Sequence, residues 1–103
     1  TPLLVATPSD NVRNGPYVWP KGPYKHIQAN KGLPETMMWS YVRENGGRGF
    51  GFTGGHKHSN WGNDNFRKAV LNGLIWISKA KVPKNGFQSS VSLEELKENL
   101  DPK

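Results

Sequence analysis

Residues 36–53 read TMMWSYVRENGGRGFGFT, and this stretch decides how the centre of the chain folds. Successive residues of a strand point to opposite faces of a sheet. In the first half of the stretch Met37, Trp39, Tyr41 and Arg43 therefore share one face, and Met38, Ser40, Val42 and Glu44 share the other. Asn45-Gly46-Gly47 follows, and these residue types readily adopt the positive φ angles of a tight turn. The pattern predicts a β-hairpin over residues 36–53.

The second arm of this hairpin alternates aromatic residues with glycines. Phe50 and Phe52 fall on one face, and Gly49 and Gly51 fall on the other. A strand face without side chains allows another backbone or a helix to approach closely. The spaced glycines also fit part of a dinucleotide-binding fingerprint, but that fingerprint belongs in a turn that opens a helix. We therefore reject a nucleotide site here.

The N-terminal third divides into a short apolar run and a long irregular segment. Residues 2–6 read PLLVA, which is typical of a strand buried on both faces of a parallel sheet, and we expect a strand over residues 1–7. Glycines and prolines punctuate residues 8–34 and predict a long loop. Its aromatic residues argue against disorder. We expect Tyr17 and Trp19 either to line a substrate cleft or to pack within the loop.

Two helices are expected downstream of the hairpin. Residues 54–62 read GGHKHSNWG, a polar, glycine-bounded loop that we call the His loop. Apolar residues then recur at helical spacing behind a capping Asn63 or Asp64, which predicts a helix over residues 63–79. Ser92 and Glu95 form the pattern of a capping box, which predicts a short second helix over residues 92–100.

The His loop carries the main candidates for chemistry. Histidine titrates near neutral pH and can act as a general acid or base or as a metal ligand. His56 is the first candidate and His58 the weaker one; if the loop is extended, both rings could reach one ion. A metal site needs at least one further ligand, and none is obvious, so we expect no metal and no other cofactor. The alternative is that both histidines hold the shape of the loop through hydrogen bonds.

Two further side chains are candidates for binding a substrate. Trp61 could stack on a sugar ring, although a hydrophobic cap over the start of the helix is the favoured interpretation. Arg48 could contact an anion, or it could simply occupy an exposed end of the hairpin.

Composition limits the classes of partner. The chain has 103 residues, 34% hydrophobic residues, no cysteine and a net charge of +6, so it forms one small domain without disulfides. Its cations occur singly or in pairs, and we expect no nucleic-acid partner. No apolar run approaches the roughly 20 residues of a membrane helix. Because the chain is rich in loop, we expect its apolar surfaces to be covered by oligomerisation or by the rest of its own domain.

A set of motifs resembles the end of a ThuA-like domain, the trehalose utilisation family. The motifs are Met38-Trp39, Gly47-Arg48-Gly49-Phe50-Gly51-Phe52, Thr53-Gly54-Gly55-His56, Trp61, Asn65-Phe66-Arg67 and Asn72-Gly73-Leu74-Ile75-Trp76. The resemblance extends over nearly the whole chain. It implies that residues 1–103 are a single, partial domain: the C-terminal part of a flavodoxin-like, class I glutamine amidotransferase-like three-layer α/β domain, with a β-hairpin and two C-terminal helices.

The resemblance also implies a kind of ligand, although most members of the family have no established activity. The family is linked to sugar utilisation, so a small-molecule substrate derived from a sugar is expected. In the amidotransferases a histidine after a late strand activates a cysteine, and His56 holds a similar place. This chain has no cysteine, and it carries Lys57-His58 where those enzymes carry Pro-Glu, so glutamine hydrolysis is not implied. An enzyme with His56 as acid or base and a non-catalytic accessory domain both remain open.

Overall fold

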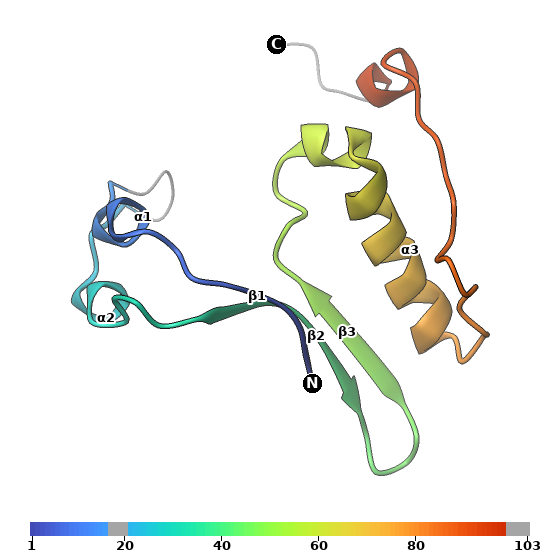
Figure 1. Ribbon diagram of the computed structural model, residues 1–103, viewed down its shortest axis with the longest axis horizontal. Coiled ribbons are helices and arrows are strands. Elements are labelled where there is room, and N and C mark those ends of the chain that lie inside the picture. The colour runs from blue at the N-terminus through green and yellow to red at the C-terminus, as the bar shows by residue number, and fades with distance from the viewer. Residues whose placement is uncertain (17–20, 99–103) are drawn as a thin grey trace.

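The computed structural model describes residues 1–16 and 21–98 and contains a small mixed α/β arrangement (Figure 1). Three strands form one antiparallel sheet in the order β1-β2-β3. Their bounds are β1 Pro2–Ala6, β2 Glu35–Val42 and β3 Arg48–Phe52. The helices are α1 Asp10–Asn14, α2 Lys25–Gln28 and α3 Asp64–Ile77, and two 3-10 turns are η1 His58–Gly62 and η2 Glu95–Lys97.

The predicted hairpin is confirmed. Strands β2 and β3 pair antiparallel, with Ser40 opposite Phe50 at the centre of the ladder. The turn closes through the Arg43 N–H, which donates to the Gly47 carbonyl at 2.7 Å. Gly46 takes a φ of 77°, which is the left-handed conformation that a glycine adopts without strain. Turn chemistry and alternation therefore agreed, and local sequence was sufficient to specify this element.

The prediction of a buried parallel strand at the N-terminus is wrong. β1 pairs antiparallel with β2 and all five of its residues are exposed. Its partner is the first strand of the hairpin, so β1 forms an outer strand of the sheet. An apolar run of five residues indicates a strand but does not state its direction or how much of it is covered. Those properties depend on which segments pack against the run.

Helix α3 packs on β3, at one face of the sheet. The Asn63 side chain caps the helix by accepting a hydrogen bond from the Phe66 N–H at 3.0 Å. The Phe66 and Phe52 rings lie 5.2 Å apart, and Gly73 lies directly against the Phe50 ring. The opposite face has no second layer in the described part of the chain. On that face the Trp39 ring lies over Gly51 and remains 42% exposed.

The C-terminal segment, residues 80–98, is attached to α3 through Arg67, a charged residue and thus one expected at the surface of a helix. Instead Arg67 is only 7% exposed. Its guanidinium donates to the Trp61 carbonyl (2.6 Å) and to the side chain and carbonyl of Ser89 (both 3.0 Å), and it pairs with Asp64. Arg67 therefore fixes the loop before the helix and the chain after it to one helical turn.

The second C-terminal helix is reduced to one 3-10 turn within the described residues. The predicted capping box is present, because the Ser92 N–H donates to the Glu95 carboxylate at 2.8 Å and the Glu95 N–H donates to the Ser92 hydroxyl at 3.1 Å. Glu98 is already extended, with φ −63° and ψ 147°. The prediction of a helix over residues 92–100 is thus wrong as far as Glu98. The box closes one turn, but a single turn gains too few hydrogen bonds to propagate into a helix by itself.

The predicted long loop contains two short helices, α1 and α2, which pack on each other as a small lobe at one end of β1 and β2 (Figure 1). Arg13 on α1 is 3% exposed and joins the lobe to the sheet. Its guanidinium donates to the Glu35 carboxylate at 2.8 Å and to the Leu33 carbonyl at 2.5 Å. Tyr17 and Trp19, expected to line a cleft or to pack within this segment, lie outside the described residues.

The attachment of this lobe is expected to weaken in acid. The hydrogen bond from Arg13 holds the pKa of Glu35 below its usual 4.5, assisted by the Arg13 charge and a weaker bond from Asn30 and opposed by desolvation. A lowered folded-state pKa gives stability that is present above about pH 4.5 and is lost as the pH falls through the lowered value. NMR titration of the Arg13 amide should show this transition below pH 4.5, and Glu35→Gln should abolish it. A midpoint at or above 4.5 would contradict the ion pair.

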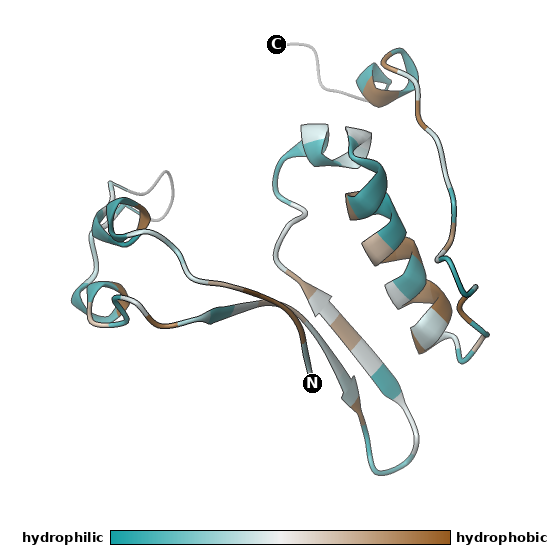
Figure 2. Cartoon of the chain, in the orientation of Figure 1, coloured by the Kyte–Doolittle hydropathy of each residue, from teal (hydrophilic) through white to brown (hydrophobic). Residues whose placement is uncertain are grey.

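Apolar burial is slight throughout the described part of the chain. None of its apolar side chains is buried, and the two buried polar residues are the arginines 13 and 67. The radius of gyration is 16.8 Å, whereas a compact domain of this length has about 13 Å. Figure 2 shows apolar residues on β1, β3 and α3 that are not enclosed by other elements. The sheet and helix therefore form an open framework with apolar surfaces available to a partner.

Candidate functional site

The His loop leaves the end of β3 and turns into α3, so strand and helix position it from both sides. At its start the Thr53 N–H donates to the Met37 carbonyl at 3.0 Å, which continues the hairpin ladder by one residue. Across the loop the Asn60 amide donates to the Gly54 carbonyl at 2.7 Å. The second half of the loop is the 3-10 turn η1. The loop is therefore internally braced rather than extended.

The two histidines of the loop have different surroundings. His56 is exposed at the tip of the loop, next to Gly55, and lies in a bend. His58 begins η1, and its Nε2 lies 2.6 Å from the Leu96 carbonyl in the C-terminal segment. Lys57, between the two histidines, is extended, with φ −90° and ψ 122°, and His58 is already engaged with the Leu96 carbonyl, so the expectation that both rings could reach one ion stays a prediction. The described residues contain no group of three His, Cys, Asp or Glu that could hold a metal ion.

The tertiary structure engages Trp61 and Arg48 in packing. The Trp61 ring meets the Phe66 ring edge to face, with centroids 5.0 Å apart, as expected for a cap over the start of the helix. Arg48 lies at the other end of β3, beside the hairpin turn. Its guanidinium stacks over the Trp76 ring at 4.9 Å and donates to the Trp76 carbonyl at 2.8 Å. The structure thus separates Arg48 from the His loop by the length of a strand.

A pocket of about 390 Å³ lies beside the His loop, where α3 starts above the sheet. We call it the asparagine pocket; its lining residues are Leu4, Phe52, Asn60, Asn63, Asn65, Phe66 and Ala69. The tilted ring pair of Phe52 and Phe66 provides an aromatic wall. Of these three asparagines, only Asn63 was expected to have a role, as a helix cap. Their spacing within residues 60–65 was the signal that could have indicated this pocket.

The asparagine pocket retains hydrogen-bonding capacity after its internal bonds are formed. The amide nitrogen of Asn60 donates a hydrogen bond to the Gly54 carbonyl, and the amide oxygen of Asn63 accepts one from the Phe66 N–H. Each amide side chain has both donor and acceptor atoms, so Asn60 keeps an oxygen and Asn63 keeps a nitrogen. Asn65 is exposed at the rim. The pocket therefore combines aromatic surface with amide donors and acceptors, a combination that suits a small, uncharged polar ligand.

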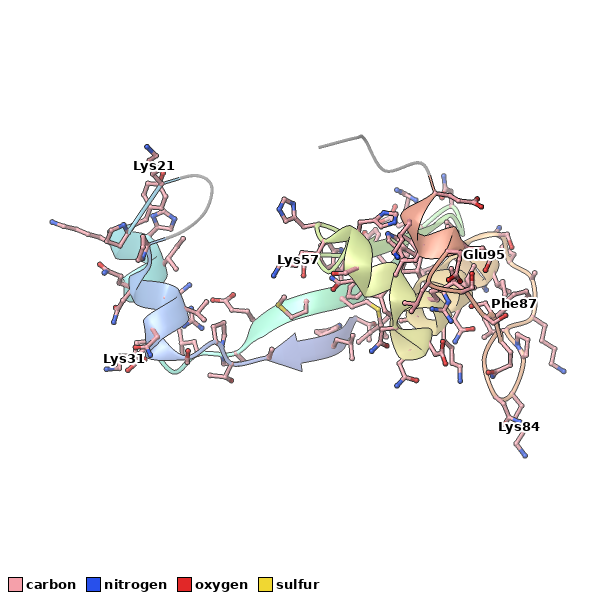
Figure 3. All side chains as sticks on the ribbon, turned by 90° about the horizontal axis from the view of Figure 1, so that it is seen from above. Lys21, Lys31, Lys57, Lys84, Phe87 and Glu95 are labelled. Carbon is pink, nitrogen blue, oxygen red and sulfur yellow. The ribbon has the colours of Figure 1, made fainter. Side chains whose placement is uncertain are left out.

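The residues that line this pocket are all uncharged. Figure 3 shows Lys21 and Lys31 on the α1–α2 lobe, Lys57 on the His loop and Lys84 on the connector after α3, each pointing outward from a separate place.

Helix α3, with 14 residues, is the longest helix of the described part, and none of the helices there is long and apolar enough to cross a bilayer.

Comparisons with known proteins give no further assignment. No family model, curated protein or solved structure matches the chain. The candidate site therefore rests on its own geometry: a braced loop that presents His56, beside a pocket lined by three asparagines and two phenylalanines.

Proposed function

We propose that this chain is the C-terminal part of a ThuA-like domain and that it binds a small polar ligand derived from a sugar. In that proposal the antiparallel strands β1–β3 are late strands of a larger flavodoxin-like sheet. The asparagine pocket carries the proposal, because aromatic carbon next to free amide groups matches the apolar faces and hydroxyl groups of a sugar. Phe52 and Phe66 would contact the ring, and the asparagines would bind hydroxyl groups.

His56 is the group that would add chemistry to binding. It is exposed in the same loop that supplies Asn60 to the pocket wall. In an enzyme it would take or deliver a proton on a hydroxyl or carbonyl group of the bound ligand. Lys57 is equally exposed and would raise the affinity for an anionic derivative.

The second candidate is a non-catalytic binding domain with a structural His loop. The hydrogen bond between His58 and the Leu96 carbonyl favours it, as does the packing of Trp61 on Phe66. Both contacts use potential site residues to hold the loop and the C-terminal segment in place. In this case the pocket binds a ligand but His56 has no part in a reaction.

Isothermal titration calorimetry of the chain with trehalose and with glucose tests the proposal. We expect saturable binding that Asn65→Ala weakens about fivefold, the value of one hydrogen bond. Asn65 is exposed, so its replacement leaves the fold intact. Asn11→Ala, in the exposed part of α1, is the matched control and should bind as the parent does. No binding, or equal affinities of the two variants, would refute a sugar site in this pocket.

His56→Ala separates the two candidate functions. If the chain is an enzyme, this variant should still bind sugar and keep its thermal stability, but it should no longer convert the bound sugar to a product. NMR spectra of the sugar measure that conversion. For a binding domain, both the parent and the variant should return the sugar unchanged. His58→Ala is the structural comparison: loss of its bond to the Leu96 carbonyl should lower stability by about 1 kcal/mol.

A further inference from the structure

The outer edge of β3 has backbone groups that point away from the sheet. The Thr53 N–H donates to Met37 and the Arg43 N–H donates to Gly47, so residues 37:53 and 43:47 are hydrogen-bonded pairs. In an antiparallel ladder such pairs alternate with non-hydrogen-bonded ones. The pairs Ser40–Phe50 and Met38–Phe52 are therefore of the second kind. The N–H and C=O groups of Phe50 and Phe52 face outward, on the side where the described sheet ends.

This edge lacks the features that protect outer strands from pairing. Proteins protect such edges with charges, prolines or bulges. Strand β3 reads RGFGF and pairs in unbroken register, with its one charge at the end beside the turn. The other outer strand, β1, contains a proline and has two irregularities in its register. Of the two outer strands, β3 thus has the regular ladder, and its outward-facing Phe50 and Phe52 carry no charge.

Helix α3 extends its apolar surface past the same edge. A groove of about 300 Å³ places Ala69, Asn72 and Trp76 on the flank of the helix that faces β1 and β2. At 3.6 residues per turn, Leu74 and Ile77 lie on the opposite flank, beyond β3. Leu74 is 51% exposed and Ile77 is 37% exposed. A fourth strand next to β3 would lie under these two side chains and remove them from water.

We propose that the edge of β3 binds an extended polypeptide strand from outside this chain, with apolar residues at every second position. The ladder of Phe50 and Phe52 requires a partner with a repeating peptide backbone. The overhang of Leu74 and Ile77 requires apolar side chains on the face toward α3. On the other face Gly49 leaves room for a larger side chain of the incoming strand, whereas the Trp39 ring already fills the space over Gly51.

A second copy of this chain fits the edge poorly. Pairing two β3 strands about a two-fold axis sets them about 4.8 Å apart. Each β3 carries an α3 packed against Phe50, and packed helices need about 8–10 Å between their axes. The two helices would therefore collide. Pairing β1 of one copy with β3 of another avoids this collision, but it uses the irregular edge of β1 and adds further copies until a ring closes or a filament forms.

This inference is independent of the ligand proposed for the asparagine pocket, and hydrogen exchange tests it first on the chain alone. In dilute solution the amides of Phe50 and Phe52 should exchange freely, while those of Gly49 and Gly51 should be protected by their bonds to β2. Protection of Phe50 and Phe52 in the monomer would show that the edge is already covered. Protection that increases with protein concentration, together with the molar mass measured by light scattering, would identify a second copy as the occupant. Either result would overturn the proposal.

The second step adds a synthetic peptide of four alternating threonine-valine pairs, flanked by lysines. It should slow exchange at Phe50 and Phe52 by roughly tenfold or more, with Gly49 and Gly51 unchanged. The same peptide N-methylated at its four central residues should have no effect. Leu74→Lys should weaken peptide binding about tenfold, whereas Leu93→Lys, an exposed leucine in the C-terminal segment, should not. No added protection, or protection only at other amides, would refute strand addition at β3.

Discussion

Replacing Arg67 by methionine is expected to lower the free energy of unfolding by about 3 kcal/mol, because the change removes the hydrogen bonds and the ion pair made by a buried guanidinium. Arg67 is one of two buried charged side chains in the described part of the chain. Its guanidinium donates hydrogen bonds to the Trp61 carbonyl, which precedes the helix, and to the hydroxyl and the carbonyl of Ser89, which follows it. Methionine retains the length of the side chain but donates no hydrogen bond.

Urea unfolding followed by circular dichroism at the helical band measures this effect. Lys57→Met, on the exposed His loop, removes a cation without removing a described contact and should shift the midpoint little. Arg67→Lys should lie between the parent and the methionine variant, since one ammonium group cannot reach all the acceptors of a guanidinium. A methionine variant as stable as the parent would mean that residues 85–92 are not held by Arg67.

Introducing valine at Gly73 is expected to destabilise the packing of α3 on β3 by about 2 kcal/mol. A Cβ atom at this position would lie 2.7 Å from Cε1 and Cζ of the Phe50 ring and 2.8 Å from Cδ1. The ring or the helix must move, because atoms at these distances overlap. Intrinsic helix propensity works in the other direction, since glycine is the weaker helix former by a few tenths of a kcal/mol, and it offsets only part of the loss.

A double-mutant cycle attributes the effect to the contact. If the Phe50 ring is the obstacle, Gly73→Val should cost much less in a Phe50→Ala background, and the two changes should not be additive. The measurement is again urea unfolding, with the four proteins compared under the same conditions. Equal costs in both backgrounds, or a valine variant more stable than the parent, would show that the helix does not pack this closely on the strand.

Local patterns predicted the central elements of the fold well. The hairpin was specified by alternation on both sides of Asn45-Gly46-Gly47, and the observed turn places Gly46 at positive φ. The cap at Asn63 and the capping box at Ser92 both form the hydrogen bonds that their sequences indicate. The hydrogen bonds of these features join residues only a few positions apart, so one short stretch of sequence contains both partners.

The candidate site was predicted less completely, for a related reason. The sequence identified the His loop, but it could not state that His58 meets the Leu96 carbonyl, 38 residues away. Nor could it state that Arg48 stacks on Trp76 or that three asparagines line one pocket with Phe52. These contacts require the hairpin, α3 and the C-terminal segment to be placed relative to one another. The ThuA-like resemblance, the sugar ligand and the role of His56 stay predictions until the experiments above are made.

The sequence by itself determined where the chain turns, where the hairpin forms and where α3 begins, because φ preferences, alternation and end-capping act within a few residues. Only the tertiary structure decided that β1 is an exposed antiparallel strand, that Arg13 and Arg67 are buried, and that β3 is an outer strand of the sheet among the described residues, next to an apolar flank of α3. Burial and strand direction depend on which distant segments meet. Apolar surface drives segments together without specifying the partner, so the same run of residues can be covered or left open.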